Sequence, residues 1–399
     1  MNRSRRAFLA AAPALPAAAR AIGRPAPVTE ASRYASFDPW VELNTANVAH
    51  NVSAIARLTG RPILAVIKNN GYGAGLVHIA RALEPLAPIH GFAVVKIDEA
   101  FRLRDAGLRK PILLMGPFDE RHISDLAERA IQPMVYTRLG AELERAAARL
   151  RRPVAVHVCV DTGIGRVGVP HRQAADFLRA LNARNAAHVS GTMMTFTEDP
   201  DFDREQLSRF ITLLDGLTRE GVKVGQRHAA SSYTLFQHKS DSFLDLVRPG
   251  MVIYGVYPEP PFRAPNLIDL RPALALRTRV VYVKQLRAGE SAGYNRAFKA
   301  ERDVWVATLP VGHADGVPRA AATGAKVRIG DVLYPIVASI SASHSIVEIG
   351  AEPAVKIGDV ATVFDWRDGS RPEDVSTSCG VSVYDLLMHL NPLLERRVA

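Results

Sequence analysis

A lysine at the end of a predicted strand is the residue of this sequence best suited to covalent chemistry. Five consecutive apolar residues, 63–67, lead directly into Lys68, and a loop of sequence NNGYG follows at 69–73. An ammonium group that is partly desolvated at such a strand exit has a depressed pKa, and its free amine can hold a carbonyl cofactor as a Schiff base. The alternative is a lysine whose aliphatic stem carries its charge out to solvent. This segment alone does not decide between a cofactor-binding lysine and a solvent-exposed one. The decision depends on the other predicted elements of the chain.

Polar residues also follow three other predicted strands. Asp161 and Arg166 come after the strand predicted at 154–160, the sequence HAASS occupies 228–232, and RPGM occupies 248–251. Serine hydroxyls and glycine N–H groups at such exits are where barrels commonly hold a phosphate. A lysine, a phosphate cradle and an arginine that can approach a ring nitrogen together indicate a pyridoxal-phosphate site.

The elements that would bring these residues together are apolar runs that alternate with helix-like segments. Apolar runs bounded by turn residues are typical of strands buried on both faces of a parallel sheet. Their number predicts a (β/α)8 TIM-type barrel over residues 36–268, with a doubly wound open sheet as the alternative. The clearest helical pattern is 203–220. The eight predicted strands are 63–67, 90–95, 111–115, 132–136, 154–160, 187–193, 225–229 and 246–253.

The chain changes character after about residue 270. Short β-rich runs are separated there by Gly, Asp or Pro, and helical periodicity returns only at 382–390. This pattern predicts a smaller, mainly β C-terminal domain over residues 269–399. Its predicted strands include 277–283, 304–309, 326–329, 346–349 and 361–364.

The first residues have the features of an export signal. A twin-arginine pattern, SRRAFL, occupies 4–9, an alanine-rich run covers 10–18, and small residues near 19–21 offer an A-x-A-like cleavage site. Residues 1–21 are therefore predicted to direct the mature protein to the periplasm. An alanine-rich tail without a targeting role is the alternative. The apolar run is too short for a stable membrane span.

Composition indicates an ordinary globular protein with a basic surface. Of the 399 residues, 48% are hydrophobic, and the formal net charge is +10. The excess arginines are scattered and are not interleaved with aromatic residues, so no nucleic-acid partner is predicted. Of the two cysteines, Cys159 lies in an apolar run and is expected to be a buried free thiol, although the sequence leaves a bond to Cys379 open.

Six segments in order resemble the alanine racemase family, of fold type III among pyridoxal-phosphate enzymes. The resemblance spans about residues 39–397. It implies that Lys68 anchors pyridoxal 5′-phosphate. It also implies a head-to-tail homodimer with shared active sites, in which Tyr294 reaches into the partner's barrel. The segments are AVIKNNGYGAG (65–75), DTGIGRVGV (161–169), HAASS (228–232), VRPGMVIYG (247–255), GESAGYNRAF (289–298) and VGHADGVPR (311–319).

The same resemblance assigns the other roles. Racemisation needs a base on each face of the α-carbon, and these would be Lys68 and Tyr294 of the partner subunit. Arg166 would stabilise the phenolate of Tyr294 and contact substrate and cofactor. Arg248 would face the pyridine nitrogen and be supported by hydrogen bonding with His228; an arginine there cannot easily give the ring a full proton. Phosphate contacts carry over to Tyr72, Ser232, Gly250 and Met251, and no metal site is implied.

Several positions depart from the family pattern. Cys159 stands where the family often has a lysine that becomes carbamylated, and His313 replaces a tyrosine at the substrate entrance. The family's Cys-Met-Asp near the substrate reads Ser-Ala-Ser at 341–343, so Ala342 removes bulk and favours a broader pocket. A second phosphate-binding tyrosine is expected at the position of Asn391. Val167 stands where the periplasmic broad-specificity racemases have an asparagine.

The sequence therefore predicts an amino-acid racemase that acts on alanine or on a broader range of substrates. Two other functions are compatible with the same fold. One is a D-amino-acid lyase, such as an aldolase, dehydratase or decarboxylase. The other is a paralogue that binds the cofactor or D-amino acids without turnover; the altered entrance motivates it, and the presence of both Lys68 and Tyr294 speaks against it.

Overall fold

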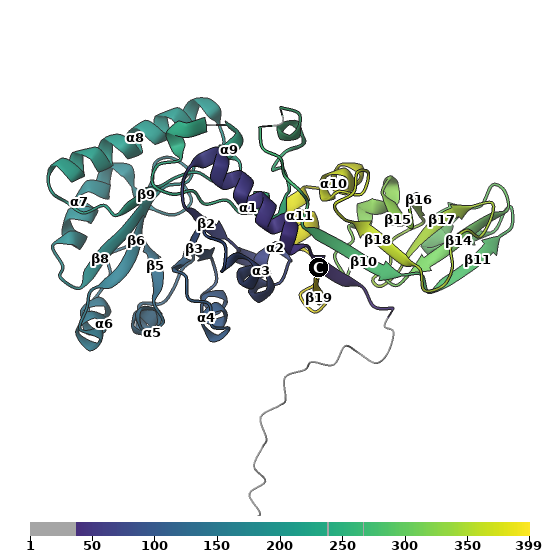
Figure 1. The fold of residues 1–399 in the computed structure, drawn as a ribbon, viewed down its shortest axis with the longest axis horizontal. Coiled ribbons are helices and arrows are strands. Elements are labelled where there is room, and N and C mark those ends of the chain that lie inside the picture. Colours follow the sequence, from purple (N-terminus) through teal and green to yellow (C-terminus); the bar gives the residue numbers. More distant parts are fainter. Residues whose placement is uncertain (1–36, 238, 266) are drawn as a thin grey trace, which may run out of the picture. The chain divides into compact units, whose positions relative to one another are not determined.

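The computed structural model describes residues 37–237, 239–265 and 267–399 (Figure 1). The predicted export signal, 1–21, lies outside the described residues. None of the helices in the described residues is long and apolar enough to cross a membrane.

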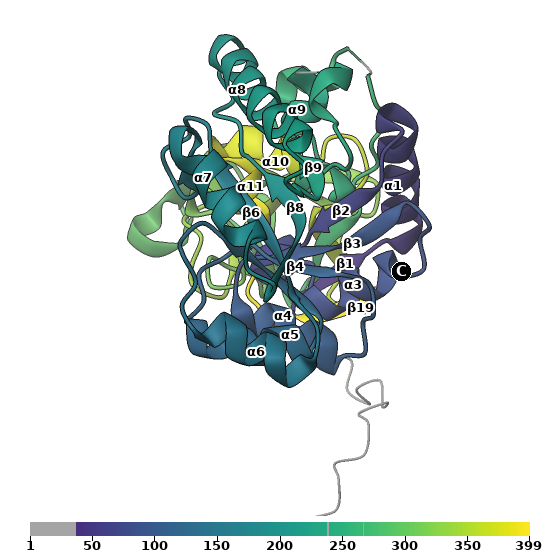
Figure 2. The ribbon, with the colours of Figure 1, turned by 90° about the vertical axis from the view of Figure 1, so that its left-hand side faces the viewer.

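Parallel strands form the predicted barrel. Seven of them follow one another in chain order around the sheet, and the two-residue strand β7 (Val169–Pro170) pairs with the edge of β6. Figure 2 shows the strands gathered inside a ring of helices. The prediction of a TIM-type barrel is confirmed. The seven strands are β2 (Ile63–Val66), β3 (Ile89–Val94), β4 (Ile112–Leu114), β5 (Ile131–Val135), β6 (Val154–Asp161), β8 (Ala187–Met193) and β9 (Gln226–His228).

The helices of the barrel bury one apolar face against these strands. In α8 (Pro200–Arg219), Phe210, Leu214 and Leu217 are buried, and the Asp199 side chain caps the first turn. A capping aspartate and a proline in the first turn satisfy or avoid the free N–H groups of a helix start. The other helices of this part are α1 (Thr45–Thr59), α2 (Lys68–Tyr72), α3 (Leu76–Leu83), α4 (Ile97–Asp105), α5 (Ile123–Glu128), α6 (Glu142–Leu150), α7 (His171–Asn182) and α9 (Thr234–Gln237).

The eighth predicted strand, 246–253, is wrong as a continuous strand. Among the described residues, a single parallel bridge, between Ile63 and Val247, closes the barrel, and it is reinforced by the Val66 N–H donating to the Pro249 carbonyl at 2.9 Å. Pro249 has no N–H for a ladder, and the chain turns at Gly250 into a 3-10 helix, Met251–Tyr254. This early end of the strand places Arg248 and Gly250 at the mouth of the barrel.

The C-terminal part is the predicted mainly β domain, and its nine-stranded sheet includes one strand from the start of the chain. β1 (Trp40–Leu43) pairs antiparallel with β10 (Leu274–Arg279) and parallel with β19 (Glu395–Val398). The assignment of 40–43 to the barrel therefore needs correction. The remaining strands of the sheet are β11 (Tyr282–Leu286), β14 (Val304–Leu309), β15 (Lys326–Ile329), β16 (Val332–Val337), β17 (Ser345–Gly350) and β18 (Val360–Phe364).

Two short helices of the C-terminal part, α10 (Pro372–Cys379) and α11 (Val383–Met388), complete the fold together with a small hairpin of β12 (Ser291–Ala292) and β13 (Phe298–Lys299). One hydrophobic core runs from the barrel strands β2–β5 through β1 into the C-terminal sheet and α11. Both cysteines, Cys159 and Cys379, are buried free thiols. The described residues contain no group of three or more His, Cys, Asp or Glu arranged to hold a metal ion.

Candidate active site

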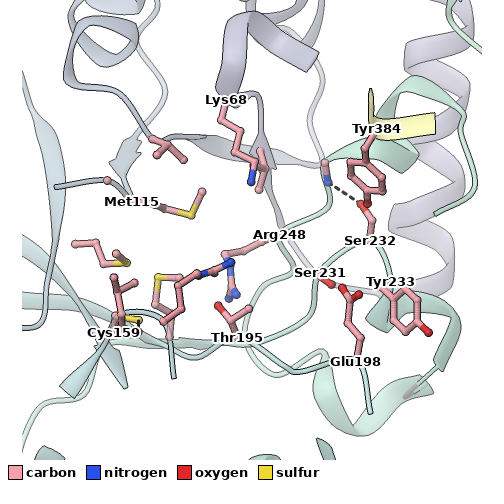
Figure 3. Close-up of a pocket in the computed structure, with 18 of the residues that line it drawn as sticks. Lys68, Met115, Cys159, Thr195, Glu198, Ser231, Ser232, Tyr233, Arg248 and Tyr384 are labelled. Atoms are coloured by element: carbon pink, nitrogen blue, oxygen red, sulfur yellow. Dashed lines mark hydrogen bonds between the residues drawn. The ribbon is translucent and has the colours of Figure 1, made fainter. Parts of the chain in front are cut away.

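A cavity of about 710 Å³ opens at the carboxyl ends of the barrel strands (Figure 3). This volume falls within the range of about 300–1,000 Å³ that is usual for small-molecule sites. Residues after β2, β6, β8 and β9 line it, together with Ser382 and Tyr384 of the C-terminal part. Six of the residues predicted for the site are among its walls: Lys68, Tyr72, Arg166, Ser232, Arg248 and Gly250.

Lys68 enters this cavity because the chain turns sharply after β2. Asn69, Asn70, Gly71 and Tyr72 all have positive φ angles, between 52° and 64°. Such angles are costly for residues other than glycine and mark positions that the surrounding structure holds in place. The Glu99 carboxylate accepts a hydrogen bond of 2.8 Å from the Asn70 N–H. Burial lowers the pKa of Lys68, and the nearby charge of Arg166 lowers it further, while Glu99 opposes both effects.

One end of the cavity is built to receive an anion such as phosphate. The Gly250 N–H donates to the Ser232 hydroxyl at 2.9 Å, which Figure 3 marks. A β-carbon at Gly250 would lie 2.5 Å from the Tyr72 hydroxyl, so only glycine fits there. The Tyr72 ring is 4% exposed, and its hydroxyl has no hydrogen-bond partner within the described residues. The hydroxyl is not among the buried unpartnered polar atoms of the described residues, so it faces the cavity, where it can donate to a phosphate. The Met251 side chain is fully buried, so only its backbone can contribute.

Arg248 is held by a hydrogen-bonded chain inside the barrel. Its Nη1 lies 3.0 Å from His228 Nδ1, and His228 Nε2 lies 3.0 Å from His157 Nδ1. His157 Nε2 in turn lies 2.8 Å from Gln132 Oε1. An arginine can only donate, so His228 accepts at Nδ1 and donates from Nε2, and the same tautomer follows for His157. Burial first, then the charge of Arg248, lowers the pKa of both imidazoles, that of His157 to about 3. Burial also lowers the pKa of Arg248 to about 10, which leaves it protonated at neutral pH.

The neutral His157 predicts a specific acid sensitivity. A histidine in the unfolded chain has a pKa near 6.5. Between that value and about 3, the unfolded state therefore binds a proton that folded His157 does not. The free energy of unfolding should fall as pH falls, by about 2 kcal/mol between pH 7 and pH 5 for this one group. The His157→Gln variant should lose less stability than the wild type over that interval in urea titrations.

The matched control is His188→Gln, because His188 is an exposed histidine of the neighbouring strand β8. It should keep the wild-type difference between the two pH values. An unchanged difference in the His157→Gln variant would show that His157 is not held neutral in the folded state.

Arg166 and Cys159 also line the cavity. Asp161 braces the loop that carries Arg166, because its Oδ1 accepts hydrogen bonds from the N–H groups of Gly163 and Gly165 at 2.9 and 3.2 Å. Arg166 forms no ion pair within the described residues, so its guanidinium is available to an anion in the cavity. Burial raises the pKa of the Cys159 thiol to about 11, so this position carries a neutral group.

Five predicted site residues do not line the cavity of their own chain: His228 and Met251, which are fully buried, and Tyr294, His313 and Ala342 of the C-terminal domain. Tyr294 lies in a 3-10 turn of the C-terminal domain and is 72% exposed. His313 contacts Arg319, with 3.0 Å between its Nε2 and the arginine Nη2. The His313 N–H pairs with the Ser341 carbonyl, which places His313 beside Ala342 in the same domain.

The sequence reasoning missed several cavity residues, among them Tyr384, Thr195, Glu198 and Glu259, and it misplaced one expected contact. Asn391 does not line the cavity but bonds the Ala314 carbonyl, whereas Tyr384 does line it, with its ring centroid 6.4 Å from that of Tyr72. Thr195 and Glu198 follow β8, so the rule that chemistry gathers at strand exits would have found them. Glu259 has no such signal in the sequence.

The sequence is similar to known proteins along most of its length. The family model "Alanine racemase, N-terminal domain" matches residues 43–258, and "Alanine racemase, C-terminal domain" matches residues 273–398. An alanine racemase of Desulforamulus reducens is 32% identical over 366 residues, which cover 90% of this chain and 98% of that protein.

Solved structures give the same result. The alanine racemase of D-cycloserine-producing Streptomyces lavendulae is 27% identical, with a TM-score of 0.83 over 90% of this chain and 97% of that one. The histidine racemase of Leuconostoc mesenteroides is 26% identical, with a TM-score of 0.80 over 90% of this chain and 98% of that one.

Proposed function

The chain belongs to the alanine racemase family and is a pyridoxal-phosphate-dependent amino-acid racemase, and we propose that its substrates extend beyond alanine. The observation that carries the racemase activity is the one cavity that holds Lys68, Arg166 and Arg248 together with a phosphate-binding end. The small Ala342, at the position where the family has methionine, supports a broader range. The similarity to a histidine racemase supports it too, because that protein acts on a bulkier amino acid.

The residues present fit pyridoxal 5′-phosphate. Tyr72, Ser232, Tyr384 and the backbone at Gly250 would hold its phosphate, and Lys68 would anchor it covalently. When bound, the cofactor withdraws electron density from the substrate and makes the α-proton acidic. Arg248 is charged and well held, but it keeps its own proton, so it would orient the ring nitrogen without protonating it.

The proton transfers are assigned to two of the chain's own bases. The lowered pKa of Lys68 makes its Nζ a suitable base for one face of the α-carbon. Arg166 would hold the substrate carboxylate, because its guanidinium faces the cavity without an acidic partner in the described part of the chain. The base for the other face is assigned to Tyr294 of the partner subunit in a head-to-tail homodimer. Its 72% exposure and its absence from the cavity wall of its own chain support a role across an interface.

The proposed activity is tested with purified protein and a chiral panel of all common amino acids in deuterated water. Alanine and several larger amino acids should lose optical purity and gain deuterium at the α-carbon. Release of a keto acid or an aldehyde in place of the enantiomer would instead indicate a lyase. A cofactor spectrum without exchange on any amino acid would indicate a protein that binds without turnover.

We also propose that the protein acts in the periplasm after twin-arginine export. The motif at 4–9 supports this, and twin-arginine export carries proteins already folded around a cofactor. Fusion of residues 1–36 to a reporter should send the reporter to the periplasm, and replacing Arg5 and Arg6 by lysine should stop this. A reporter that stays in the cytoplasm with the intact segment would contradict the proposal.

A further inference from the structure

The hydrogen bonds behind Arg248 continue well below the cavity. His228 ends β9, and its Nε2 lies 3.0 Å from Nδ1 of His157 in the middle of β6. His157 Nε2 lies 2.8 Å from Oε1 of Gln132, the second residue of β5, so the hydrogen bonds run from the barrel mouth toward the amino ends of the strands. Neither His157 nor Gln132 lines the cavity. We call the four residues Arg248, His228, His157 and Gln132 the Arg248 network.

A glycine of the neighbouring strand makes room for the imidazole of His157. A β-carbon at Gly191 in β8 would lie 2.6 Å from His157 Nδ1 and 2.7 Å from its Cε1. A glycine inside a strand weakens it and often marks the close approach of another group. The rings of His157 and His228 meet edge to face, with their centroids 5.1 Å apart, and both side chains are buried. The barrel interior therefore holds the two imidazoles in fixed places.

The guanidinium of Arg248 has two kinds of support. Figure 3 shows it extending into the cavity. Its Nη2 donates to the backbone carbonyls of Met194, at 2.7 Å, and Ala229, at 3.1 Å. These two bonds hold one nitrogen, so the bond from Nη1 to His228 Nδ1, at 3.0 Å, sets the remaining rotation of the guanidinium plane.

The Arg248 network carries its hydrogen bonds in one direction. A guanidinium has donors and no acceptor, and a neutral imidazole has one of each. Burial lowers the pKa of both imidazoles, and the charges of Arg248 and His90 lower it further, so both rings are neutral. Each ring must then accept on the side of Arg248 and donate on the other side, and Gln132 ends the series by accepting at Oε1. A donor at position 132 would reverse both tautomers and turn an N–H of His228 against an N–H of Arg248.

We propose that Gln132 and His157 are positioning residues for Arg248. The acceptor at position 132 fixes both imidazole tautomers and thereby keeps the Arg248 guanidinium oriented toward the cofactor's ring nitrogen. This inference rests on the proposed role of Arg248 and extends it to two residues outside the cavity. It makes the hydrogen-bonding character of residue 132, rather than its size, the property that matters.

The first test does not depend on catalysis. Nitrogen NMR of protein with isotope-labelled histidine, at about pH 8, reports which ring nitrogen carries the proton, and each signal is assigned from the variant that lacks it. In the wild type, both His157 and His228 should carry the proton on Nε2. Gln132→Lys offers only donors and should move both protons to Nδ1, whereas Gln132→Glu keeps an acceptor and should leave them on Nε2. A proton on Nδ1 of either ring in the wild type, or unchanged tautomers in Gln132→Lys, would overturn the inference.

The second test separates kcat from KM for racemisation of alanine. In Gln132→Lys, kcat should fall about tenfold while KM changes less than about twofold, because Arg166 is assigned to the substrate carboxylate. Gln132→Glu should keep kcat within about twofold of the wild type, and Gln132→Leu, which fills similar space without an acceptor, should lie between the two. The control Gln173→Lys makes the same change at an exposed position of α7 and should alter neither constant.

The outcomes distinguish this inference from the proposed activity. Reversed tautomers with an unchanged kcat would show that the Arg248 network does not position Arg248, and would overturn the inference. Equal kcat values for Gln132→Leu and Gln132→Glu would do the same, since they would assign residue 132 a packing role. If Gln132→Lys does not fold, the comparison of these two variants decides. A wild type without racemase activity would instead contradict the proposed function, and the tautomers would still decide on the direction of the network.

Discussion

Replacing Lys68 by alanine is expected to abolish racemisation and the visible absorbance of the bound cofactor together. Lys68 lies in the cavity wall with a lowered pKa, and it is assigned both as the covalent anchor and as one of the two bases. Loss of a residue with two such roles should lower kcat by about 10⁴-fold or more. The measurements are chiral chromatography for turnover and the absorption spectrum of protein purified with excess cofactor.

A second variant, Lys68→Arg, keeps the positive charge near Arg166 and Glu99 but cannot form the covalent link to the cofactor. It should be as inactive as Lys68→Ala. Lys326→Ala, at an exposed position of β15, should retain full activity and the cofactor spectrum. Racemisation by Lys68→Arg at a rate near the wild type would refute the assignment of Lys68 as anchor.

The barrel was predictable because its strands are buried on both faces and therefore read as continuous apolar runs. The same property gave a wrong prediction at 246–253, since the segment LVRPGMVI is mostly apolar for another reason. Met251, Val252 and Tyr254 are buried in a 3-10 helix at the barrel mouth, not in a ladder. The proline at 249 was the available signal. The position of β1 could not be foreseen, because four residues before a helix carry no sign of a pairing with β10 and β19.

The residues of the active site were likewise only partly predictable from the sequence. Lys68, Arg166 and Arg248 were predictable because each follows a barrel strand, and strand exits converge on one face. Tyr384 was not, because it reaches the cavity from α11, more than a hundred residues after the last barrel strand, and only tertiary packing brings it near Tyr72. The hydrogen bonds that link Arg248 through His228 to Gln132 could not be predicted beyond His228 either. A histidine inside an apolar strand gives no indication of its hydrogen-bond partners.

Replacing Tyr294 by phenylalanine is expected to separate the two directions of the reaction. The phenol is assigned to one face of the α-carbon and Lys68 to the other, so removal of the hydroxyl should lower racemisation by about 10³-fold. Exchange of the α-proton should persist better for the enantiomer whose proton faces Lys68. Deuterium incorporation into each enantiomer, followed separately by mass spectrometry, measures this asymmetry. Tyr282→Phe, another exposed tyrosine of the same domain, should affect neither direction. Equal residual exchange from both enantiomers would contradict the assignment.

The position of Tyr294 also makes the assignment testable without structure determination of a complex. Tyr294 is exposed and absent from the cavity that contains Lys68, so under the proposed assignment an intact site takes Lys68 from one chain and Tyr294 from another. Lys68→Ala and Tyr294→Phe homodimers should each be inactive. Random reassociation makes about half of the dimers mixed, each with one intact site of two, so mixing should restore about a quarter of the wild-type activity. If both residues served one site within a single chain, every mixed dimer would still lack an intact site. Restored activity on mixing would therefore place the tyrosine across the interface, whereas its absence in dimers shown to have exchanged would return it to its own chain.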